Sequence, residues 1–218
     1  MPKPIPLVLA THNKGKIREI HRLLSGYPID LKTLDDFGPI PPVVEDGDSF
    51  EANAYKKASH VARVIGMAAM ADDSGLMVAA LDGAPGIHSA RYGGEGASDG
   101  DRCQKLLAEM SDKDNRAAAF VCAMSIAVPT GPALTYEARC EGQLTREPRG
   151  ENGFGYDPIF LFPELGRTFA QLSADEKGRV SHRGKALKEI TEEIDKIITW
   201  LRIHMPTPDR FPCAGGTP

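Results

Sequence analysis

The adjacent carboxylates Asp72 and Asp73 are the residues of this sequence with the clearest potential for chemistry. They follow a small, apolar run and are followed at once by Ser74 and Gly75. Neighbouring acids at the end of a strand can hold a divalent cation or orient a water molecule. The same residue types also form ordinary solvated turns. We therefore expect a strand that ends in a turn at residues 71–76, and both explanations of the acids stay open.

A polar segment at residues 11–16 is a candidate phosphate site. It lies between an apolar run at residues 5–10, which predicts a buried strand, and a helical pattern at residues 17–24. Free backbone N–H groups and the positive end of the helix dipole favour phosphate at such a junction, and Lys14 and Lys16 add positive charge. A solvated helix cap with two surface lysines explains the segment equally well.

A second acidic cluster, at residues 45–51, overlaps the start of a predicted helix over residues 49–65. Acids in the first turn of a helix complement its dipole, so a structural role for the cluster is the simpler explanation. Asn53 and Lys57 are four residues apart on that helix and therefore share a face. Lys57 is either a solvated surface lysine or a cation that reaches the same pocket as the acids.

Residues 153–158 combine glycines with aromatic side chains. Glycines let a ligand approach the backbone and the rings closely, so Phe154 could stack on a planar base. Asp157 could accept a hydrogen bond from a ring N–H of that base. A turn that only packs into the core is the alternative.

Positive charge gathers at the predicted start of the last helix, residues 181–203. Lys177 lies just before this start, and His182 and Arg183 lie at it. Cations are unfavourable at a helix N-terminus because they meet the positive end of the dipole. We therefore expect an anion or a carbonyl group to offset their charge.

The remaining hydrophobic pattern predicts the elements that must position these residues. Residues 76–81 fit a short strand, and residues 83–100 are expected to form mostly loop. Residues 117–128 and 134–144 predict a hairpin whose first strand is buried on both faces and whose second strand has one wet face. This succession of strands and helices favours an α/β protein.

Composition limits the partners of the chain. Its 218 residues are 41% hydrophobic and carry a formal net charge of −4, which gives no global field to attract nucleic acid or an anionic membrane. The four cysteines show no zinc-ligand spacing, so we expect unpaired thiols in a reduced compartment. We expect neither a signal peptide nor a membrane-spanning segment, and therefore a cytoplasmic protein.

Several of these segments, in order along the chain, resemble motifs of the inosine triphosphate pyrophosphatase family. They are residues 11–16, Glu45 with residues 49–53, residues 71–75, residues 85–92, residues 154–158 and residues 181–184. The resemblance extends over about residues 8–201. Any one motif is weak evidence, whereas their succession is specific. Enzymes of this family hydrolyse ITP, dITP and XTP to the nucleoside monophosphate and pyrophosphate, using magnesium.

The resemblance implies a role for each candidate residue. The triphosphate would be bound by Thr11, His12, Asn13, Lys14, Gly15 and Lys16, with further charge from Lys57. Glu45 and Asp73 would hold Mg²⁺, and Asp73 would also be the general base. Ser74 would contact the substrate. The base pocket would consist of Phe154, Gly155, Tyr156, Asp157, Lys177, His182 and Arg183, with donors from the last three directed to the 6-oxo group.

The expected architecture is α/β, with a curved mixed sheet and helices that form two lobes around a central nucleotide cleft. Residues 1–205 would form this single domain, and residues 206–218 a flexible Pro/Gly-rich tail. The resemblance also implies a homodimer with a house-cleaning role in the nucleotide pool, and no nucleic-acid or membrane partner. Two alternatives stay open: a pyrophosphatase of related fold that acts on dTTP or UTP, and a nucleotide-binding protein without catalysis.

Overall fold

A seven-stranded mixed sheet forms the centre of the computed structural model, which describes residues 4–205. The predicted tail at residues 206–218 lies outside the described residues. The strands are β1 (Ile5–Leu9), β2 (Ile29–Thr33), β3 (Ala69–Val78), β4 (Ala117–Ala127), β5 (Ala133–Leu144), β6 (Phe160–Phe162) and β7 (Arg167–Thr168). The helices are α1 (Lys14–Leu23), α2 (Phe50–Ile65), α3 (Asp99–Glu109), α4 (Ala174–Val180), α5 (His182–Glu192) and α6 (Ile194–His204). The predicted fold class is confirmed.

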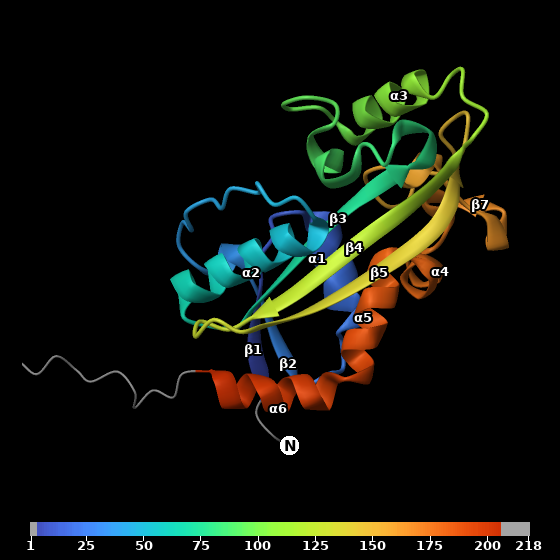
Figure 1. Cartoon of the computed structure of the whole chain (residues 1–218). Helices are drawn as coiled ribbons and strands as arrows, with labels where there is room; N and C mark the ends of the chain where they lie inside the picture. Colours follow the sequence, from blue (N-terminus) through green and yellow to red (C-terminus); the bar gives the residue numbers. More distant parts are fainter. Residues whose placement is uncertain (1–3, 206–218) are drawn as a thin grey trace, which may run out of the picture.

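The strands follow the order β2-β1-β3-β4-β5-β6-β7 across the sheet. β1 pairs in parallel with β2 and β3, whereas β3, β4, β5, β6 and β7 pair successively in antiparallel fashion. Figure 1 shows β3, β4 and β5 as the long strands that run from the part of the molecule around α2 to the part around α3. The sheet curves along this length. α2 lies near one end of the long strands and α3 near the other (Figure 1).

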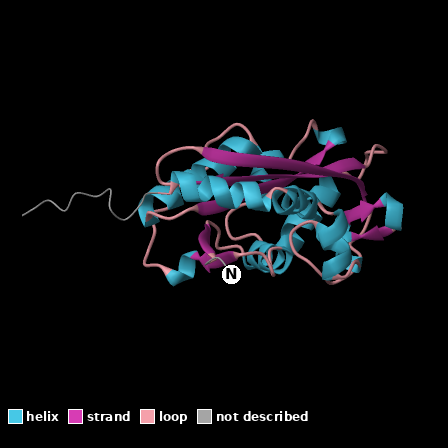
Figure 2. Cartoon of the chain, turned by 90° about the horizontal axis from the view of Figure 1, so that it is seen from below, coloured by secondary structure: helices cyan, strands magenta, loops and turns pink. Residues whose placement is uncertain are grey.

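Different helices cover the two faces of the sheet near β1. On one face α2 packs against Val8, Ala69 and Ala71, whose small or short side chains allow the helix to lie close. On the other face Leu9 and Met70 pack into a cluster with residues of α1, α5 and α6. Figure 2 shows helices on both sides of the strands. Because side chains alternate along a strand, each residue of β3 is assigned to one of these two environments.

The adjacent acids lie in the middle of a strand, and the turn predicted at residues 71–76 is wrong. β3 continues to Val78 because it pairs with β4 along its whole length, from Ala69↔Ala127 to Val78↔Ala118. The predicted strand over residues 76–81 is likewise the end of β3, followed by a short 3-10 helix, Ala79–Leu81.

The edge of β3 is open beyond the end of β1. Their pairing is limited to Val8↔Ala69 and Leu9↔Met70, and the last backbone bond between the two segments runs from the Ala10 N–H to the Met70 oxygen. From Asp72 to Gly75, this edge has no strand partner within residues 4–205, and further along it Met77 forms an isolated bridge with Pro85. The open edge leaves space for a ligand beside the acids.

Capping residues and the hydrophobic pattern of the sequence predicted several elements correctly. Ser49 caps α2 through its side chain and Gly66 ends it in the left-handed region, as the helix predicted over residues 49–65 requires. The predicted hairpin is confirmed by β4 and β5, and one face of β5 is exposed. Among the described helices, none is long and apolar enough to cross a membrane.

The single helix predicted over residues 181–203 is wrong. Its hydrophobic pattern is divided between α5 and α6, because Glu193 (φ −104°, ψ 11°) leaves the helical conformation. The break lets both segments bury isoleucines in the same cluster, at Ile190 and Ile194. Figure 1 shows α6 turned away from the axis of α5 and running beneath β1 and β2. The short elements β2, β6, β7 and α4 were not predicted.

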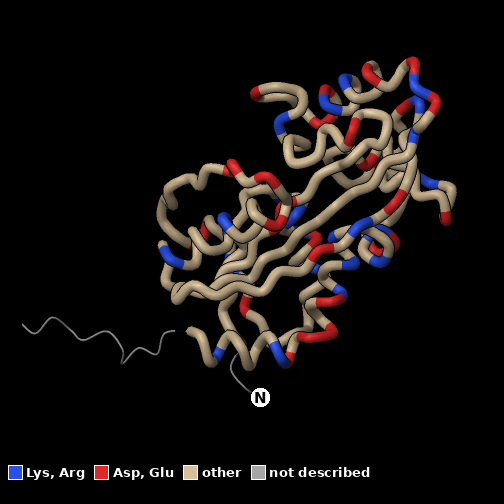
Figure 3. Tube along the Cα trace, viewed as in Figure 1, with Lys and Arg blue, Asp and Glu red and all other residues tan. Residues whose placement is uncertain are grey.

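Charged residues of both signs occur in each part of the described chain (Figure 3). Figure 3 shows Lys and Arg interspersed with Asp and Glu at both ends of the molecule. This mixture agrees with the expectation, from a formal net charge of −4, that the chain has no global field. Strong local charge is concentrated in the cleft beside β3 instead.

Candidate active site

A cavity of about 550 Å³ opens along the free edge of β3. A volume of this size is typical of pockets for small ligands. The predicted residues that line it are Thr11, His12, Asn13, Lys16, Glu45, Lys57, Asp73, Ser74, Phe154, Gly155, Tyr156, Asp157, Lys177, His182 and Arg183. Lys14 and Gly15 are the predicted residues outside this lining. The cavity thus brings together segments from most of the chain.

The segment at the N-terminus of α1 is organised by Asn13. Its Oδ1 accepts hydrogen bonds from the backbone N–H groups of Gly15 (2.9 Å) and Lys16 (3.1 Å). These two N–H groups, which were expected to face phosphate, therefore form a side-chain cap. Gly15 is buried beneath Phe154, since a Cβ atom there would lie 2.5 Å from the ring. The Lys14 side chain is exposed.

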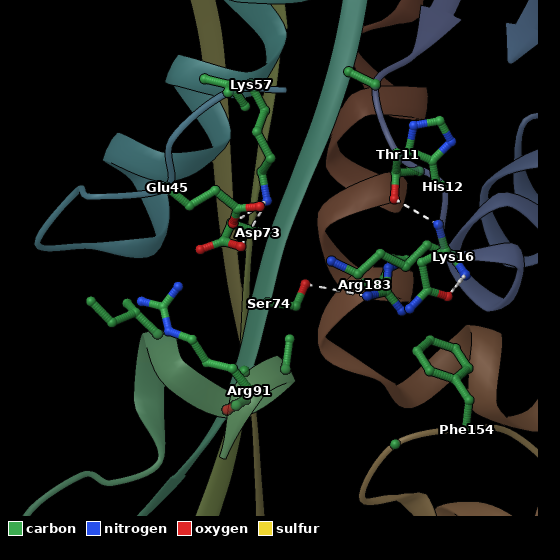
Figure 4. Close-up of a pocket in the computed structure, with 18 of the residues that line it drawn as sticks. Thr11, His12, Lys16, Glu45, Lys57, Asp73, Ser74, Arg91, Phe154 and Arg183 are labelled. Carbon is green, nitrogen blue, oxygen red and sulfur yellow. Dashed lines mark hydrogen bonds and ion pairs between the residues drawn. The ribbon is translucent and has the colours of Figure 1, made fainter. Parts of the chain in front are cut away.

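Glu45 and Asp73 converge on the ammonium group of Lys57. The Lys57 Nζ lies 2.8 Å from Asp73 Oδ1 and 3.1 Å from Glu45 Oε2. Burial opposes the charge of Lys57, but Asp73 and Glu45 outweigh burial and raise the pKa of the ammonium group. The loop that carries Glu45 is held to α2 by a contact of 2.8 Å between His60 Nε2 and the Pro41 oxygen. Figure 4 shows the two carboxylates and Lys57 on one side of β3.

One oxygen of Asp73 remains available. Its Oδ2 is buried and has no hydrogen-bond partner among the described residues. Burial raises the pKa of Asp73, and the neighbouring Lys57 opposes this rise only in part. A buried acceptor without a donor is costly, so a cation or a water proton is the expected partner of Asp73 Oδ2.

Asp72 lies on the opposite face of β3 and is fully enclosed by donors. Its carboxylate forms an ion pair with Lys16 and accepts a hydrogen bond from Arg183 Nε at 3.2 Å. Ser74 Oγ and Cys122 Sγ also donate to it. Burial alone would raise its pKa, but Arg183 and Lys16 hold the pKa of Asp72 well below its usual range. The sequence left Asp72 either as an acid that holds a cation or orients water or as a turn residue, and the resemblance assigned it no role.

Glu19 of α1 completes the charge balance around the last predicted motif. Its carboxylate forms ion pairs with Arg183 and with Lys177, the latter at 2.8 Å. The anions expected near these cations are therefore carboxylates of the chain itself: Asp72 and Glu19, together with Asp157 at Lys177. Glu19 was not predicted, although it lies three residues after Lys16 on the same face of α1.

Phe154 forms one wall of the other end of the cavity. Lys177 Nζ lies 4.7 Å and Arg183 Cζ 5.6 Å from the centre of its ring. The Asp157 carboxylate accepts a hydrogen bond from the Phe154 N–H (2.9 Å) and pairs with Lys177 at 2.6 Å. Burial raises the pKa of Asp157 against the opposing effect of Lys177. Asp157 thus fixes the Phe154 loop as well as facing the cavity.

Two further contacts hold the loop that carries Phe154. The Gly155 N–H donates to Asp99 Oδ2 at 2.6 Å, and the Tyr156 hydroxyl donates to the Ser89 backbone oxygen at 2.8 Å. The ring of Tyr156 belongs to the hydrophobic core around α3. Tyr156 therefore contributes mainly to the position of the loop.

His182 is buried and neutral. Its ring stacks on Phe120, with ring centres 4.6 Å apart and planes 9° apart. Burial, together with the charges of Arg183 and Lys177, holds the pKa of His182 well below its usual range. Its Nδ1 has no partner within the described part of the chain. A neutral His182 can donate only one ring N–H.

Comparison with known proteins gives matches over most of the chain. The chain matches the Ham1 family over residues 7–193. It is 60% identical over 203 residues to a dITP/XTP pyrophosphatase of Syntrophobacter fumaroxidans, covering 93% of this chain and 87% of that protein. It is 48% identical to a dITP/XTP pyrophosphatase of Geobacter sulfurreducens, covering 86% of this chain and 96% of that protein.

Solved structures agree with these sequence matches. A HAM1 protein from Coxiella burnetii superposes with a TM-score of 0.82 at 41% identity, covering 88% of this chain and 99% of that one. A Ham1 protein from Staphylococcus aureus gives a TM-score of 0.79 at 38% identity, covering 88% of this chain and 99% of that one. The resemblance inferred from the motifs is confirmed, and the chain belongs to the Ham1 family.

Proposed function

We propose that the chain hydrolyses dITP, ITP and XTP to the nucleoside monophosphate and pyrophosphate, as a house-cleaning enzyme of the nucleotide pool. The observation that carries this proposal is the meeting of Glu45 and Asp73 at Lys57, across an open strand edge from Phe154. One end of the cavity is thus suited to a charged polyphosphate and the other to a flat ring. The names of the related proteins support the same class of enzyme.

Mg²⁺ fits the donors at the phosphate end. The buried Asp73 Oδ2 lacks a partner among the described residues, and Glu45 lies beside the same lysine. Magnesium is commonly bound by one or two carboxylates together with substrate phosphates and water. It needs no complete protein cage, and among residues 4–205 no group of three His, Cys, Asp or Glu side chains forms one. Held by Glu45 and Asp73, Mg²⁺ would offset phosphate charge.

Asp73 is the proposed general base. A carboxylate whose pKa is raised by burial accepts a proton more readily than an exposed one. The oxygen of a water molecule attacks the α-phosphorus, and one proton of that water passes to Asp73. The bond between the α-phosphorus and the bridging oxygen breaks, and its electron pair leaves with pyrophosphate. The products are the nucleoside monophosphate and pyrophosphate.

The backbone of Ser74 is the second proposed contact at the reacting phosphate. The Met70 and Asp72 oxygens and the Leu76 N–H all point to the open side of β3, toward Ala10, Lys16 and Ser89 respectively. Because backbone groups alternate along a strand, the N–H of Ser74 points to the same side. It can donate to a phosphate oxygen without any change in the sheet.

Selectivity for a 6-oxo purine is proposed to arise from Lys177 and Arg183. The Lys177 ammonium group has three N–H donors and spends two on Glu19 and Asp157. Arg183 likewise retains an N–H on Nη1, beyond the one directed to Glu19. An amino group in place of the oxygen would leave these donors unmet, at a cost of about 1–3 kcal/mol, or roughly tenfold to hundredfold in preference.

A pyrophosphate-release assay tests the proposal. Purified protein is given ITP, XTP, GTP, ATP and dTTP, each with and without Mg²⁺. The proposal expects turnover of ITP and XTP with Mg²⁺ and much weaker turnover of ATP and dTTP. Preference for dTTP would favour a pyrophosphatase of related fold that acts on dTTP or UTP, and no turnover of any of these nucleotides would favour a nucleotide-binding protein.

A homodimer is proposed on the resemblance alone. Light scattering of the eluted protein measures its mass in solution and would overturn the proposal if it gave a monomer. The division into one domain at residues 1–205 and a tail, and a cytoplasmic location, stay predictions.

A further inference from the structure

Arg91 differs from the other cations that line the cavity. These others are Lys16, Lys57, Arg102, Lys177 and Arg183, and each lies within 4.0 Å of a carboxylate oxygen. Arg91 has no such partner among the described residues. Its charge is therefore not offset by the protein, and it is the cation best placed to meet an anionic ligand.

His88 holds the Arg91 guanidinium group in position. Arg91 Nε and Nη2 lie 3.2 Å and 2.8 Å from His88 Nδ1. Arginine can only donate, so Nδ1 is the acceptor in this contact. The histidine thus orients the guanidinium group without neutralising it and leaves Nη1 free.

The segment that carries Arg91 is firmly attached to β3. It is a 3-10 helix, Gly86–Arg91, within the region predicted as mostly loop. Ser89 Oγ accepts from the Leu76 N–H at 2.9 Å, which joins this helix to the open edge of the strand. A Cβ atom on Gly75 would clash with the Gly86 oxygen, so glycine is needed for this approach.

Figure 4 shows the guanidinium end of Arg91 directed toward Glu45 and Asp73, from the side of β3 opposite Thr11 and Lys16. A polyphosphate bound at these carboxylates would lie between the Arg91 side and the Lys16 side of the cleft. The lysines there are already paired with Asp72, Asp73 and Glu45, so an unpaired cation adds more to the binding of an anion than either lysine does.

We propose that Arg91 is a catalytic residue that donates to the oxygens of the phosphoryl group under attack and stabilises the charge that develops there. This inference rests on the proposed pyrophosphatase function. The planar fork of arginine donors matches phosphate oxygens, which lysine cannot reproduce. Because its contacts strengthen as water adds to the α-phosphorus and the bridging P–O bond breaks, Arg91 acts mainly on kcat.

The test compares steady-state ITP hydrolysis by the wild type, Arg91→Ala, Arg91→Lys and His88→Ala. Arg91→Ala should lower kcat about 100-fold, the loss typical of a removed transition-state donor. Arg91→Lys should recover only part of the rate, and added guanidinium ion should partly rescue Arg91→Ala but not Arg91→Lys. His88→Ala should lower kcat less than Arg91→Ala, since it removes only the orientation.

Arg63→Ala is the matched control, because it removes an exposed arginine of α2 that does not line the cavity. Circular dichroism checks that all variants are folded. If the wild type hydrolyses ITP and Arg91→Ala has the kcat of Arg63→Ala, the role of Arg91 is overturned while the proposed function stands. A rise in KM with unchanged kcat also overturns it. If the wild type does not hydrolyse ITP, the proposed function itself fails.

Discussion

The two faces of β3 use the same residue type in opposite ways. On one face Asp72 is buried among donors from Lys16, Arg183, Ser74 and Cys122, and its charge is fully compensated. On the other face Asp73 keeps one buried oxygen without a partner in the described chain. Adjacent carboxylates therefore differ in role because alternation along a strand sends them to different helices. The first is suited to hold the site together, and the second to do chemistry.

Asp73→Asn should have the largest effect on activity. If it had none, the contrast between a structural Asp72 and a catalytic Asp73 would not hold. The amide cannot accept the proton of the attacking water, so kcat for ITP should fall about 10³-fold, within the range of general acid–base catalysis. Stability should fall less than in Asp72→Asn, because an uncharged group replaces a carboxylate that burial disfavours and Lys57 keeps Glu45 as its partner. Pyrophosphate release and urea unfolding measure the two quantities. Wild-type turnover in this variant would remove Asp73 from the mechanism.

Asp72→Asn should give the reverse result. Loss of its charge leaves Lys16 without its partner and Arg183 with only Glu19, so the free energy of unfolding should fall by about 3–5 kcal/mol. Urea unfolding monitored by circular dichroism measures the change, with Asp73→Asn as the matched control. Equal stability of the two variants would contradict the assignment of a structural role to Asp72.

Glu45→Gln tests whether the Glu45 carboxylate binds Mg²⁺ beside Asp73. Removing a residue that only orients a metal ligand lowers metal affinity about 10- to 100-fold. Removing the Glu45 carboxylate, a proposed ligand itself, should therefore raise the Mg²⁺ concentration for half-maximal activity at least about 10-fold. Stability should change little because the carboxylate is partly exposed. Titration of activity with Mg²⁺ measures the shift.

Asp46→Asn is the control for Glu45→Gln. Asp46 is exposed in the same loop and pairs with Lys56 rather than Lys57. It should leave the Mg²⁺ requirement unchanged. An equal shift in both variants would show that the loop, and not the Glu45 carboxylate, determines the requirement.

Local patterns in the sequence were sufficient for part of this architecture. The apolar spacing and the Ser49 and Gly66 caps gave α2, and alternation gave the β4–β5 hairpin. The strand through Asp72 and Asp73 was predicted as a turn because Asp, Ser and Gly are ordinary turn residues. Pairing with β4 and ion pairs on both faces override that preference, and neither can be read from neighbouring residues.

The candidate site, too, could be predicted only in part from local sequence patterns. Motif residues such as Glu45, Lys57 and Phe154 were identified and lie in one cavity. Glu19 was missed because its partners Lys177 and Arg183 lie 158 and 164 residues away in the sequence. A lone acid on an amphipathic helix carries no sign of such a pairing. The charge balance behind the motifs therefore becomes visible only once the chain is folded.

The smallest expected effect is a difference in the pH range over which the two acids act on stability. The folded pKa of Asp72 lies below its unfolded value of about 3.9, so Asp72 stabilises the fold above that pH and loses its contribution as pH falls through the folded pKa. The folded pKa of Asp73 is raised, so Asp73 destabilises the fold at neutral pH. This cost disappears as pH falls through the raised pKa toward 3.9.

Urea unfolding of the wild type and both Asn variants between about pH 3 and pH 7 measures these ranges. On lowering the pH, the stability of Asp73→Asn should approach that of the wild type first, because its pKa is the higher one. The deficit of Asp72→Asn should persist to lower pH, since the carboxylate stays ionised in the fold. If both differences vanished over one pH range, the two acids would share an environment, and their separation onto opposite faces of β3 would not govern their charge.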